Sequence, residues 1–329
     1  MLLIVAKKLL QLALVVFLVT LFTFTLVRLK PGEPEDLLVP LRSVGTSQEA
    51  KDVIEKRKAE IRADLYLDRP LYVQYGRWVA DFAQGDLGNY YQVSSEPPVV
   101  DRVKDSLPVS IQLMVYAQLL ALVIAIPMGV YSAYRANRPV DKVANTTAFG
   151  MLAMPNFALG LILAYYVGVK LRWVPPTGYV SPEVDLVRHL KTMFLPALSL
   201  AVGQIAIYMR LLRSDMIQTL QEDFILMAKS KGISNARVLW RHALRPSSLT
   251  LLTVAGLNVG ALIGGAVVIE NVFALPGMGF LIAEAILTEQ YVALQSCVAI
   301  IAIGYVLINF MLDFLYAVLD PRIRNVRTA

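Results

Sequence analysis

Four ionisable residues stand in or beside strongly apolar stretches, and they are the first candidates for chemistry: His189, His242, Glu270 and Asp313. An ionisable side chain within an apolar, membrane-spanning segment is a candidate functional residue by default. The two histidines fall on opposite sides of the apolar run 192–209, so they cannot share a metal ion. The two carboxylates each stand at the end of an apolar run, where snorkelling or helix capping is the simpler interpretation.

Motifs for nucleotide binding and for metal-dependent hydrolysis are absent from the sequence. There is no G-x-x-x-x-G-K-[ST] loop to hold phosphates and no H-E-x-x-H pair to hold zinc. No Ser, His and Asp fall together within the apolar runs, and a chain of carboxylates for proton relay is missing. The sequence therefore predicts no catalytic residue, no cofactor and no metal, so the energy for any transport must come from a partner.

Residues 223–246 form a basic, amphipathic segment between two long uncharged runs. The first part, 223–231, predicts a short helix with apolar residues, and the lysines of its last turn complement the negative end of the helix dipole. Gly232 fits the left-handed position that commonly follows a helix. A glycine break after one short helix is therefore expected here.

A second short helix, 235–245, is predicted after that glycine, with Ser234 or Asn235 as its N-cap. It carries arginines on one side and apolar residues on the other. A plain loop would need only a few polar residues, whereas two amphipathic helices need a surface to pack on. Anionic lipid is one such surface, but the glycine break favours a groove in a partner protein.

The elements that must position this segment are apolar helices. The chain has 329 residues, of which 57% are hydrophobic and only 17% charged, whereas soluble domains contain about 25% charged residues. Six uncharged runs are each long enough for a helix that crosses a hydrocarbon core about 30 Å thick. These runs are Leu9–Val27, Ser106–Tyr134, Val143–Val169, Thr192–Met209, Pro246–Ile269 and Gln290–Leu312. The sequence therefore predicts an all-α integral membrane protein with six transmembrane helices.

A seventh run, 271–283, contains Pro276, Gly277 and Gly279 and is too short to span the bilayer. We expect a re-entrant or interfacial excursion there. The first apolar run is longer than the apolar part of a signal peptide and lacks a cleavage site, so it is interpreted as a signal anchor. Cys297 lies in the last run and is expected to be a buried, unpaired side chain.

Lysine and arginine set the orientation. With the N-terminus inside, the cytoplasmic segments hold fifteen of these residues, whereas the short outside loops hold four, namely Lys170, Arg172, Arg188 and Lys191. Since positive charge in short loops favours the cytoplasmic side, both termini are predicted to be cytoplasmic. The formal net charge of +6 is thus a topology signal, and it does not indicate nucleic acid binding.

The chain divides by composition into two parts. Residues 1–105 are predicted to form one transmembrane helix and a long extracytoplasmic loop, and residues 106–329 a core of five helices. Within the loop, 46–64 predicts an exposed helix capped by Thr46 or Ser47, and the aromatic-rich stretch that follows predicts a helix on the outer membrane surface.

Glycine and proline patterns mark the core. Gly256, Gly260 and Gly264 are spaced by four and predict one groove along a helix, where another backbone can approach closely. Helix packing is the favoured interpretation of these glycines, and contact with substrate is the alternative. Prolines in three adjacent runs are expected to bend their helices. They are Pro127, Pro155 and Pro196.

The basic segment resembles the cytoplasmic EAA loop of importer permeases in the ATP-binding cassette (ABC) class. The resemblance is carried by Ala228, by Gly232 after three intervening residues, and by Leu244 about twelve residues later. Leu and Met precede Ala228 where that motif's name predicts Glu and Ala, and Arg245 stands where Pro is usual. With these departures the segment is similar to the dipeptide, oligopeptide and nickel permease branch.

Further matches to that branch cover nearly the whole chain in the expected order. They are 31–34 (PGEP), 67–70 (LDRP), 85–88 (GDLG), 173–175 (WVP) with Gly178, 270–273 (ENVF), 276–279 (PGMG) and 320–322 (DPR). The charged segment 40–62 is longer than is typical of the branch.

The resemblance implies a type I ABC importer permease fold and a set of partners. These are a second homologous permease subunit, two cytoplasmic ABC ATPases, an extracytoplasmic substrate-binding protein and membrane lipid, in the cell membrane of a prokaryote. The resemblance also implies that residues 214–246, here named the coupling loop, dock in an ATPase groove. The implied contact residues are Asp223, Met227, Ala228, Lys231, Gly232, Ile233, Ser234, Asn235 and Leu244.

On the outer side, the resemblance implies that Phe273, Pro276, Gly277 and Gly279 shape a gate or meet the binding protein. Peptides are the cargo expected on family grounds, while nickel or a larger conjugate such as haem stays open. An autonomous channel or secondary carrier is the main alternative, against which stand the lack of inverted repeats and of intramembrane charges. A membrane enzyme would need a cluster of catalytic side chains at one interface, which the sequence lacks.

Overall fold

The structure is a computed structural model, and it describes residues 2–28, 48–91 and 97–319. Helices dominate this part of the chain, where the only extended pairing is a bridge between Asn89 and Pro98. The chain forms two compact units, Met1–Pro108 with Pro276–Phe310, and Val109–Leu275 with Met311–Ala329. They are named unit 1 and unit 2.

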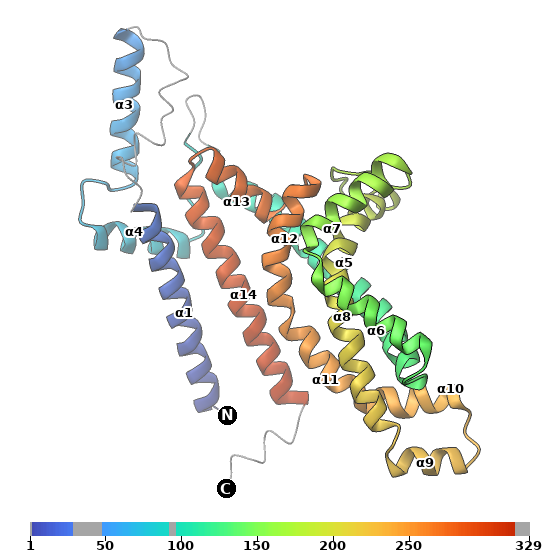
Figure 1. Cartoon of the computed structure of the whole chain (residues 1–329). Helices are drawn as coiled ribbons and strands as arrows, with labels where there is room; N and C mark the ends of the chain where they lie inside the picture. Colours follow the sequence, from blue (N-terminus) through green and yellow to red (C-terminus); the bar gives the residue numbers. More distant parts are fainter. Residues whose placement is uncertain (1, 29–47, 92–96, 320–329) are drawn as a thin grey trace. The chain divides into compact units, whose positions relative to one another are not determined.

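Unit 1 is built from helices at both ends of the chain (Figure 1). They are α1 (Leu2–Arg28), α3 (Gln48–Asp64), α4 (Leu71–Ala83), the start of α5 (Val99–Tyr134), α13 (Met278–Leu287) and α14 (Tyr291–Leu319) as far as Phe310. A core of apolar side chains from the loop before α5, from α5, α13 and α14 holds the unit together, and it includes the buried thiol of Cys297. The expectation for this cysteine is confirmed.

The loop before α5 is fastened to α14. Ser296 donates a hydrogen bond to the carbonyl of Leu87 at 2.8 Å, and the Gln290 amide forms two 2.9 Å hydrogen bonds with the backbone N–H and carbonyl of Tyr91. Near the start of α5, Arg102 forms a two-point ion pair with Glu284, at 3.2 and 2.6 Å. These bonds join segments that are 182 to 209 residues apart in the sequence into one body.

Unit 2 is centred on one long helix, α8 (Leu186–Thr219), most of whose apolar residues are buried. Helices α6 (Pro139–Ala153), α7 (Asn156–Leu163), α11 (Leu244–Leu257) and α12 (Val259–Phe273) pack against it. The later part of α5 approaches α8 closely at Gly129, where an added Cβ would lie 3.1 Å from the carbonyl oxygen of Met209. Helix α8 is therefore the central helix of unit 2, and the other helices pack around it.

The prediction of an all-α integral membrane protein is confirmed, and each of the six predicted spans lies on a helix or a bent helix pair. Helices α5, α8 and the described part of α14 are each long and apolar enough to cross a membrane. The first run lies on α1. The short run 271–283 covers the end of α12 and most of the short helix α13, and its re-entrant or interfacial position stays a prediction. The helices predicted at 46–64 and after residue 65 are α3 and α4, while Thr46 and Ser47 lie outside the described residues.

The third and fifth spans differ from continuous helices. The chain bends by 100° between α6 and the helix formed by α7 and the π-helical segment η2 (Ala164–Lys170), and by 46° between α11 and α12. The first break falls at Pro155, because proline lacks an N–H and clashes with the preceding turn. The second falls at Asn258, without a proline. Pro127 and Pro196 instead lie inside uninterrupted helices, so the helix is broken at only one of the three prolines, and a bend at the other two stays a prediction.

Candidate functional site

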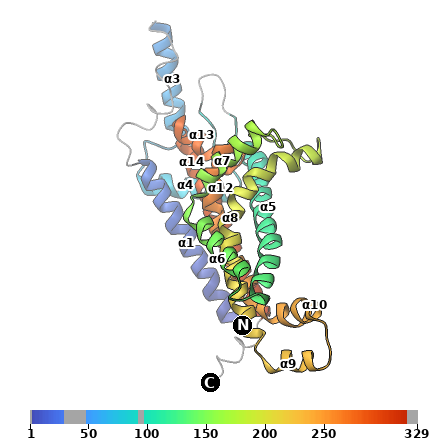
Figure 2. The same cartoon turned by 45° about the vertical axis from the view of Figure 1, so that its right-hand side comes forward.

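The coupling loop folds as two short helices joined at Gly232. Helix α9 (Asp223–Ser230) ends at a turn in which the N–H of Gly232 donates to the carbonyl of Lys229 at 2.9 Å. Gly232 has φ of +75°, so the predicted left-handed break is confirmed. The chain returns through α10 (Asn235–Arg237) and the π-helical segment η3 (Val238–Ala243), which leads into α11. Figures 1 and 2 both show α9 and α10 side by side beyond the end of α8.

One side of this helix pair is buried in the core of unit 2. Ile225 and Ala228 of α9 meet Val238 and Ala243 of η3, and all four are buried in the same apolar cluster as Met216 near the end of α8. Residues three apart on α9 lie on one face of the helix, so this spacing orients the helix. The buried side therefore fixes α9 against the rest of the unit.

The opposite side of α9 exposes large apolar side chains. Phe224, Leu226 and Met227 are all exposed, and Met227 leaves 55% of its surface accessible. Exposed basic residues lie on the same coupling loop. They are Lys229, Lys231, Arg237 and Arg241. An apolar patch with a polar rim is the composition of a protein interface.

Hydrogen bonds tie the coupling loop to its neighbours. The hydroxyls of Thr219, at the end of α8, and Ser247, in α11, lie 2.9 Å apart, and the Ser247 hydroxyl donates to the carbonyl of Ala243 at 2.9 Å. The amide of Asn235 lies 3.5 Å from the hydroxyl of Tyr134, the last residue of α5. The loop is thus fixed to three helices and can pass a displacement on to them.

A buried ion pair next to this site was not foreseen from the sequence. Asp141, at the start of α6, accepts two hydrogen bonds from the guanidinium of Arg213 in α8, the Nη2–Oδ2 bond being 2.6 Å long. The same carboxylate accepts hydrogen bonds from Ser132, Asn145 and the N–H of Asn137. Full pairing of a buried carboxylate is needed because an unpaired one is costly. The sequence signal was weak, since both residues lie among other charges near the ends of spans.

The predicted coupling residues divide between the two sides. Asp223, Met227, Lys231, Gly232, Ser234 and Asn235 are exposed, Ile233 and Leu244 are half-buried, and Ala228 is buried. Ser234 occupies the N-cap position of α10, but its side chain makes no capping hydrogen bond. A partner can therefore contact most of the set directly, while Ala228 supports α9 from behind.

The glycine groove is interrupted by the bend at Asn258. Gly256 lies on α11, whereas Gly260 and Gly264 lie on α12. A Cβ on Gly264 would meet nothing within 4 Å, while one on the adjacent Gly265 would lie 2.9 Å from Cδ2 of Leu200 in α8. The close helix approach within this chain is therefore at Gly265, and one continuous stripe with Gly256, Gly260 and Gly264 is not formed.

The predicted outer residues mostly face the interior of their units. Phe273 is buried in unit 2, packs on Gly160 and accepts a hydrogen bond from the N–H of Gly178 at 3.0 Å. In unit 1, Gly277 precedes α13 and is buried together with Gly279. Pro276 alone among the four is exposed. Gating or contact with a binding protein stays a prediction for these residues.

The ionisable residues of the apolar runs have structural surroundings. Glu270 is buried and accepts a 2.6 Å hydrogen bond from Ser110, so of the two expected accounts, snorkelling or helix capping, snorkelling is wrong. Helix α12 continues past Glu270 to Phe273. His189 is buried between Tyr116 and the carbonyl of Val180. The side chain of Asp313 lies outside the described ones. In the described residues, no three His, Cys, Asp or Glu side chains gather as a metal site.

Comparison with known proteins identifies relatives along the full length of the chain. The model of a family described as "Binding-protein-dependent transport system inner membrane component" matches residues 125–325. The oligopeptide transport system permease protein AppB of Bacillus subtilis (strain 168) is 35% identical over 307 residues, which cover 93% of this chain and 94% of AppB. A Brucella abortus (strain 2308) protein named as a peptide transport system permease is 35% identical over 320 residues, 97% of this chain and 98% of its own length.

A solved structure supports the fold. In the inward-facing MetNI methionine ABC transporter, one chain is similar to this one with a TM-score of 0.52 and 14% sequence identity, over 67% of this chain and 96% of that chain. At this identity the likeness concerns the fold alone, and the fold that it supports is that of a type I ABC importer permease.

Proposed function

The chain belongs to the family of binding-protein-dependent transport system inner membrane components, and from this premise we propose that it is the permease subunit of an ATP-driven peptide importer. The peptide cargo is supported by the names of full-length relatives from two bacterial lineages. The chain supplies half of a translocation pathway in a cell membrane, and a second, similar permease supplies the other half. In this proposal, residues 1–105 supply the first transmembrane helix and the outer loop, and residues 106–329 supply the five-helix core with the coupling loop; this division by topology differs from the two compact units of the fold.

ATP hydrolysis belongs to separate subunits in this proposal. Two cytoplasmic ABC ATPases each receive one coupling loop, and an extracytoplasmic binding protein delivers peptide to the outer face, where residues 273–279 contribute to the gate. The exposed apolar side of α9 is the observation that carries the proposal, because Phe224, Leu226 and Met227 together form an apolar patch of the kind that marks a protein interface.

The buried side of α9 explains how docking can drive transport. Ile225 and Ala228 pack into the same cluster as Met216 in α8, and Ser247 links the loop to α11. When the ATPases close and pull the loop, the displacement therefore passes to α8 and α11 as a rigid-body motion. Packed helices transmit such shifts because their cores are close-packed and barely compressible.

Substitution of the exposed side tests this proposal without disturbing the core. Met227→Asp is expected to lower co-purification of an ABC ATPase with this chain by about tenfold or more, since burying one Met side chain is worth about 1.5–3 kcal/mol. ATP-driven uptake of a dipeptide into proteoliposomes should fall with it. Val184→Asp is the matched control, because Val184 is 80% exposed and lies outside the coupling loop. Undiminished ATPase recovery and uptake with Met227→Asp would refute the docking assignment.

A further inference from the structure

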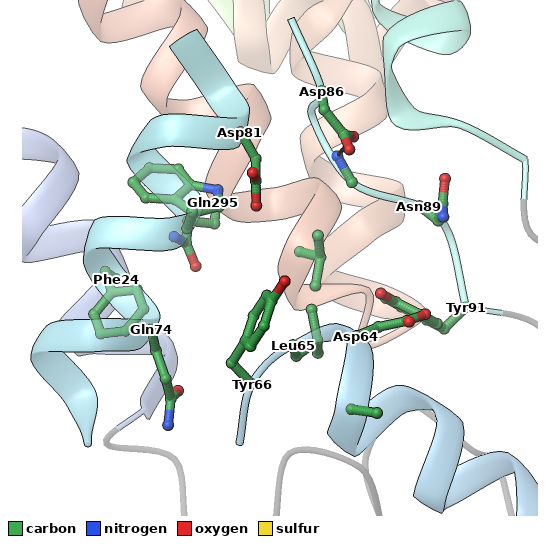
Figure 3. A pocket seen from close by; sticks show the side chains of 14 residues that line it. Phe24, Asp64, Leu65, Tyr66, Gln74, Asp81, Asp86, Asn89, Tyr91 and Gln295 are labelled. Carbon is green, nitrogen blue, oxygen red and sulfur yellow. Dashed lines mark hydrogen bonds between the residues drawn. The ribbon is translucent and has the colours of Figure 1, made fainter. Parts of the chain in front are cut away.

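Unit 1 contains a cavity of about 490 Å³ that the transport proposal does not use. Its lining comes from α1, the end of α3, α4, the loop 86–91 and the start of α14 (Figure 3). Ligand pockets in proteins typically have volumes of about 300–1,000 Å³. The cavity is therefore large enough for a small organic molecule.

The charged groups of the lining are all negative. Asp64 is the last residue of α3, Asp81 lies in α4 and Asp86 lies in the loop 86–91. Figure 3 shows these three side chains around the cavity. The described lining residues include no Lys, Arg or His. Asp86 accepts a 2.9 Å hydrogen bond from the N–H of Gly88, whereas Asp64 and Asp81 are in no ion pair with a described residue. Arg77 stacks on the Tyr66 ring at 5.4 Å but is not part of the lining.

Buried polar atoms without partners also line this cavity. The side chains of Gln74 and Gln295 are each only 6% exposed, yet Oε1 of Gln74 and Nε2 of Gln295 have no hydrogen-bond partner. The Gln74 amide is fixed because its Nε2 donates to the carbonyl of Arg69 at 2.8 Å. The indole N–H of Trp78 is likewise unpaired. A buried polar atom left unsatisfied costs about 1–3 kcal/mol, so these three atoms favour a ligand that bonds to them.

The pattern of groups selects the chemistry of that ligand. Carboxylates bind a cation, the Gln74 oxygen accepts from an N–H, and the Gln295 and Trp78 nitrogens donate to a carbonyl. No three acidic side chains among the described residues gather closely enough to hold a metal ion. An ammonium group joined to a peptide unit offers the cation, the N–H and the carbonyl together, and the terminal amine of a peptide is charged below its pKa of about 7.7–8.0.

We propose that this cavity binds the positively charged amino-terminal end of a peptide, with Asp64 and Asp81 facing the ammonium group and Gln74, Trp78 and Gln295 bonding to the first peptide unit. The proposal rests on the peptide importer function and deepens it, because it places a cargo recognition site on the permease itself. The same groups would disfavour a peptide whose terminal amine is blocked, since that peptide would cover two carboxylates without supplying a cation to pair with them.

Equilibrium binding to the full-length chain in lipid nanodiscs tests this site. The probe is alanyl-alanine amide at pH 6.5, titrated calorimetrically and compared with its N-acetylated, uncharged analogue. Acetylation is expected to weaken binding by about tenfold or more, because a charge-assisted hydrogen bond is worth about 1.5–3 kcal/mol. Asp81→Asn and Asp64→Asn should each weaken binding of the free peptide by a similar factor. Asp105→Asn, an exposed carboxylate outside the cavity, should leave it unchanged.

Several results would overturn the proposal. They are equal binding of the acetylated and free peptides, the same loss with Asp105→Asn as with Asp81→Asn, no saturable binding, and displacement of the peptide by calcium chloride. If Asp81→Asn fails to fold, Asp64→Asn decides, because Asp64 lines the cavity but is exposed. The measurement needs no ATPase, so its failure and failure of the docking test on Met227 are distinguishable.

Discussion

At the scale of single residues, Gly88 is held where no other residue fits. Its φ is +79°, and an added Cβ would lie only 2.4 Å from Cγ1 of Val292 in α14. Gly88→Ala is therefore expected to cost about 1–2 kcal/mol in backbone strain and a further 1–3 kcal/mol in overpacking. A lowered thermal unfolding temperature of the purified chain in detergent would report this loss.

Gly85 is the matched control for that substitution. It has φ of +90°, but a Cβ there would meet nothing within 4 Å. Gly85→Ala thus introduces the strain without the clash, and it should lower the unfolding temperature by clearly less than Gly88→Ala. Equal effects of the two would mean that α14 gives way at Val292 and that steric fit does not fix this loop.

Residue-scale prediction succeeded where local chemistry decides the conformation. Gly232 is predicted to be left-handed because it is a glycine directly after a predicted helix, and its positive φ confirms this. The interpretations of Gly264 and Glu270 were less accurate. The side of α12 that faces α8 is set by tertiary packing, which the local sequence pattern does not show. The contact fell on Gly265, one residue away, and Glu270 turned inward to Ser110.

At the scale of helices, the ion pair between Asp141 and Arg213 fastens α6 to α8 beside the coupling loop. Arg213→Gln leaves a buried carboxylate without its cation, which costs about 3–5 kcal/mol. Arg210→Gln, one turn earlier on α8, removes only a contact of the guanidinium with the Phe149 ring at 4.1 Å, worth about 0.5–1 kcal/mol. The unfolding temperature in detergent should fall much further for Arg213→Gln, and the reverse order would show that the pair does not support this junction.

The presence of the helices could be predicted from the sequence, whereas the positions at which they bend sharply could not. All six apolar runs lie on helices, because about 20 apolar residues in lipid have few other ways to satisfy their backbone. The 100° bend fell at Pro155, yet Pro127 and Pro196 leave their helices uninterrupted. Neighbouring helices can satisfy the backbone groups that a proline leaves unpaired, and this determines whether the helix bends sharply. The sequence alone does not show which helices are neighbours.

At the scale of the whole molecule, the coupling loop and the loop before α8 must lie on opposite sides of the membrane if this chain works as an importer. The charge bias predicts that Ser234 is cytoplasmic and Val184 extracytoplasmic, and both are exposed residues of unit 2. Cys297, the single native cysteine, is fully buried and so should not react with an added reagent. One introduced cysteine therefore reports one position.

In intact spheroplasts, Val184→Cys should react with a membrane-impermeant maleimide, whereas Ser234→Cys should react only after the membrane is permeabilised. The unmodified chain should stay unlabelled in both conditions because the Cys297 side chain is inaccessible. Labelling of Ser234→Cys from outside would place the exposed side of α9 away from ATP. No cytoplasmic ATPase could then reach Phe224, Leu226 and Met227, and the drive for transport would have to come from elsewhere.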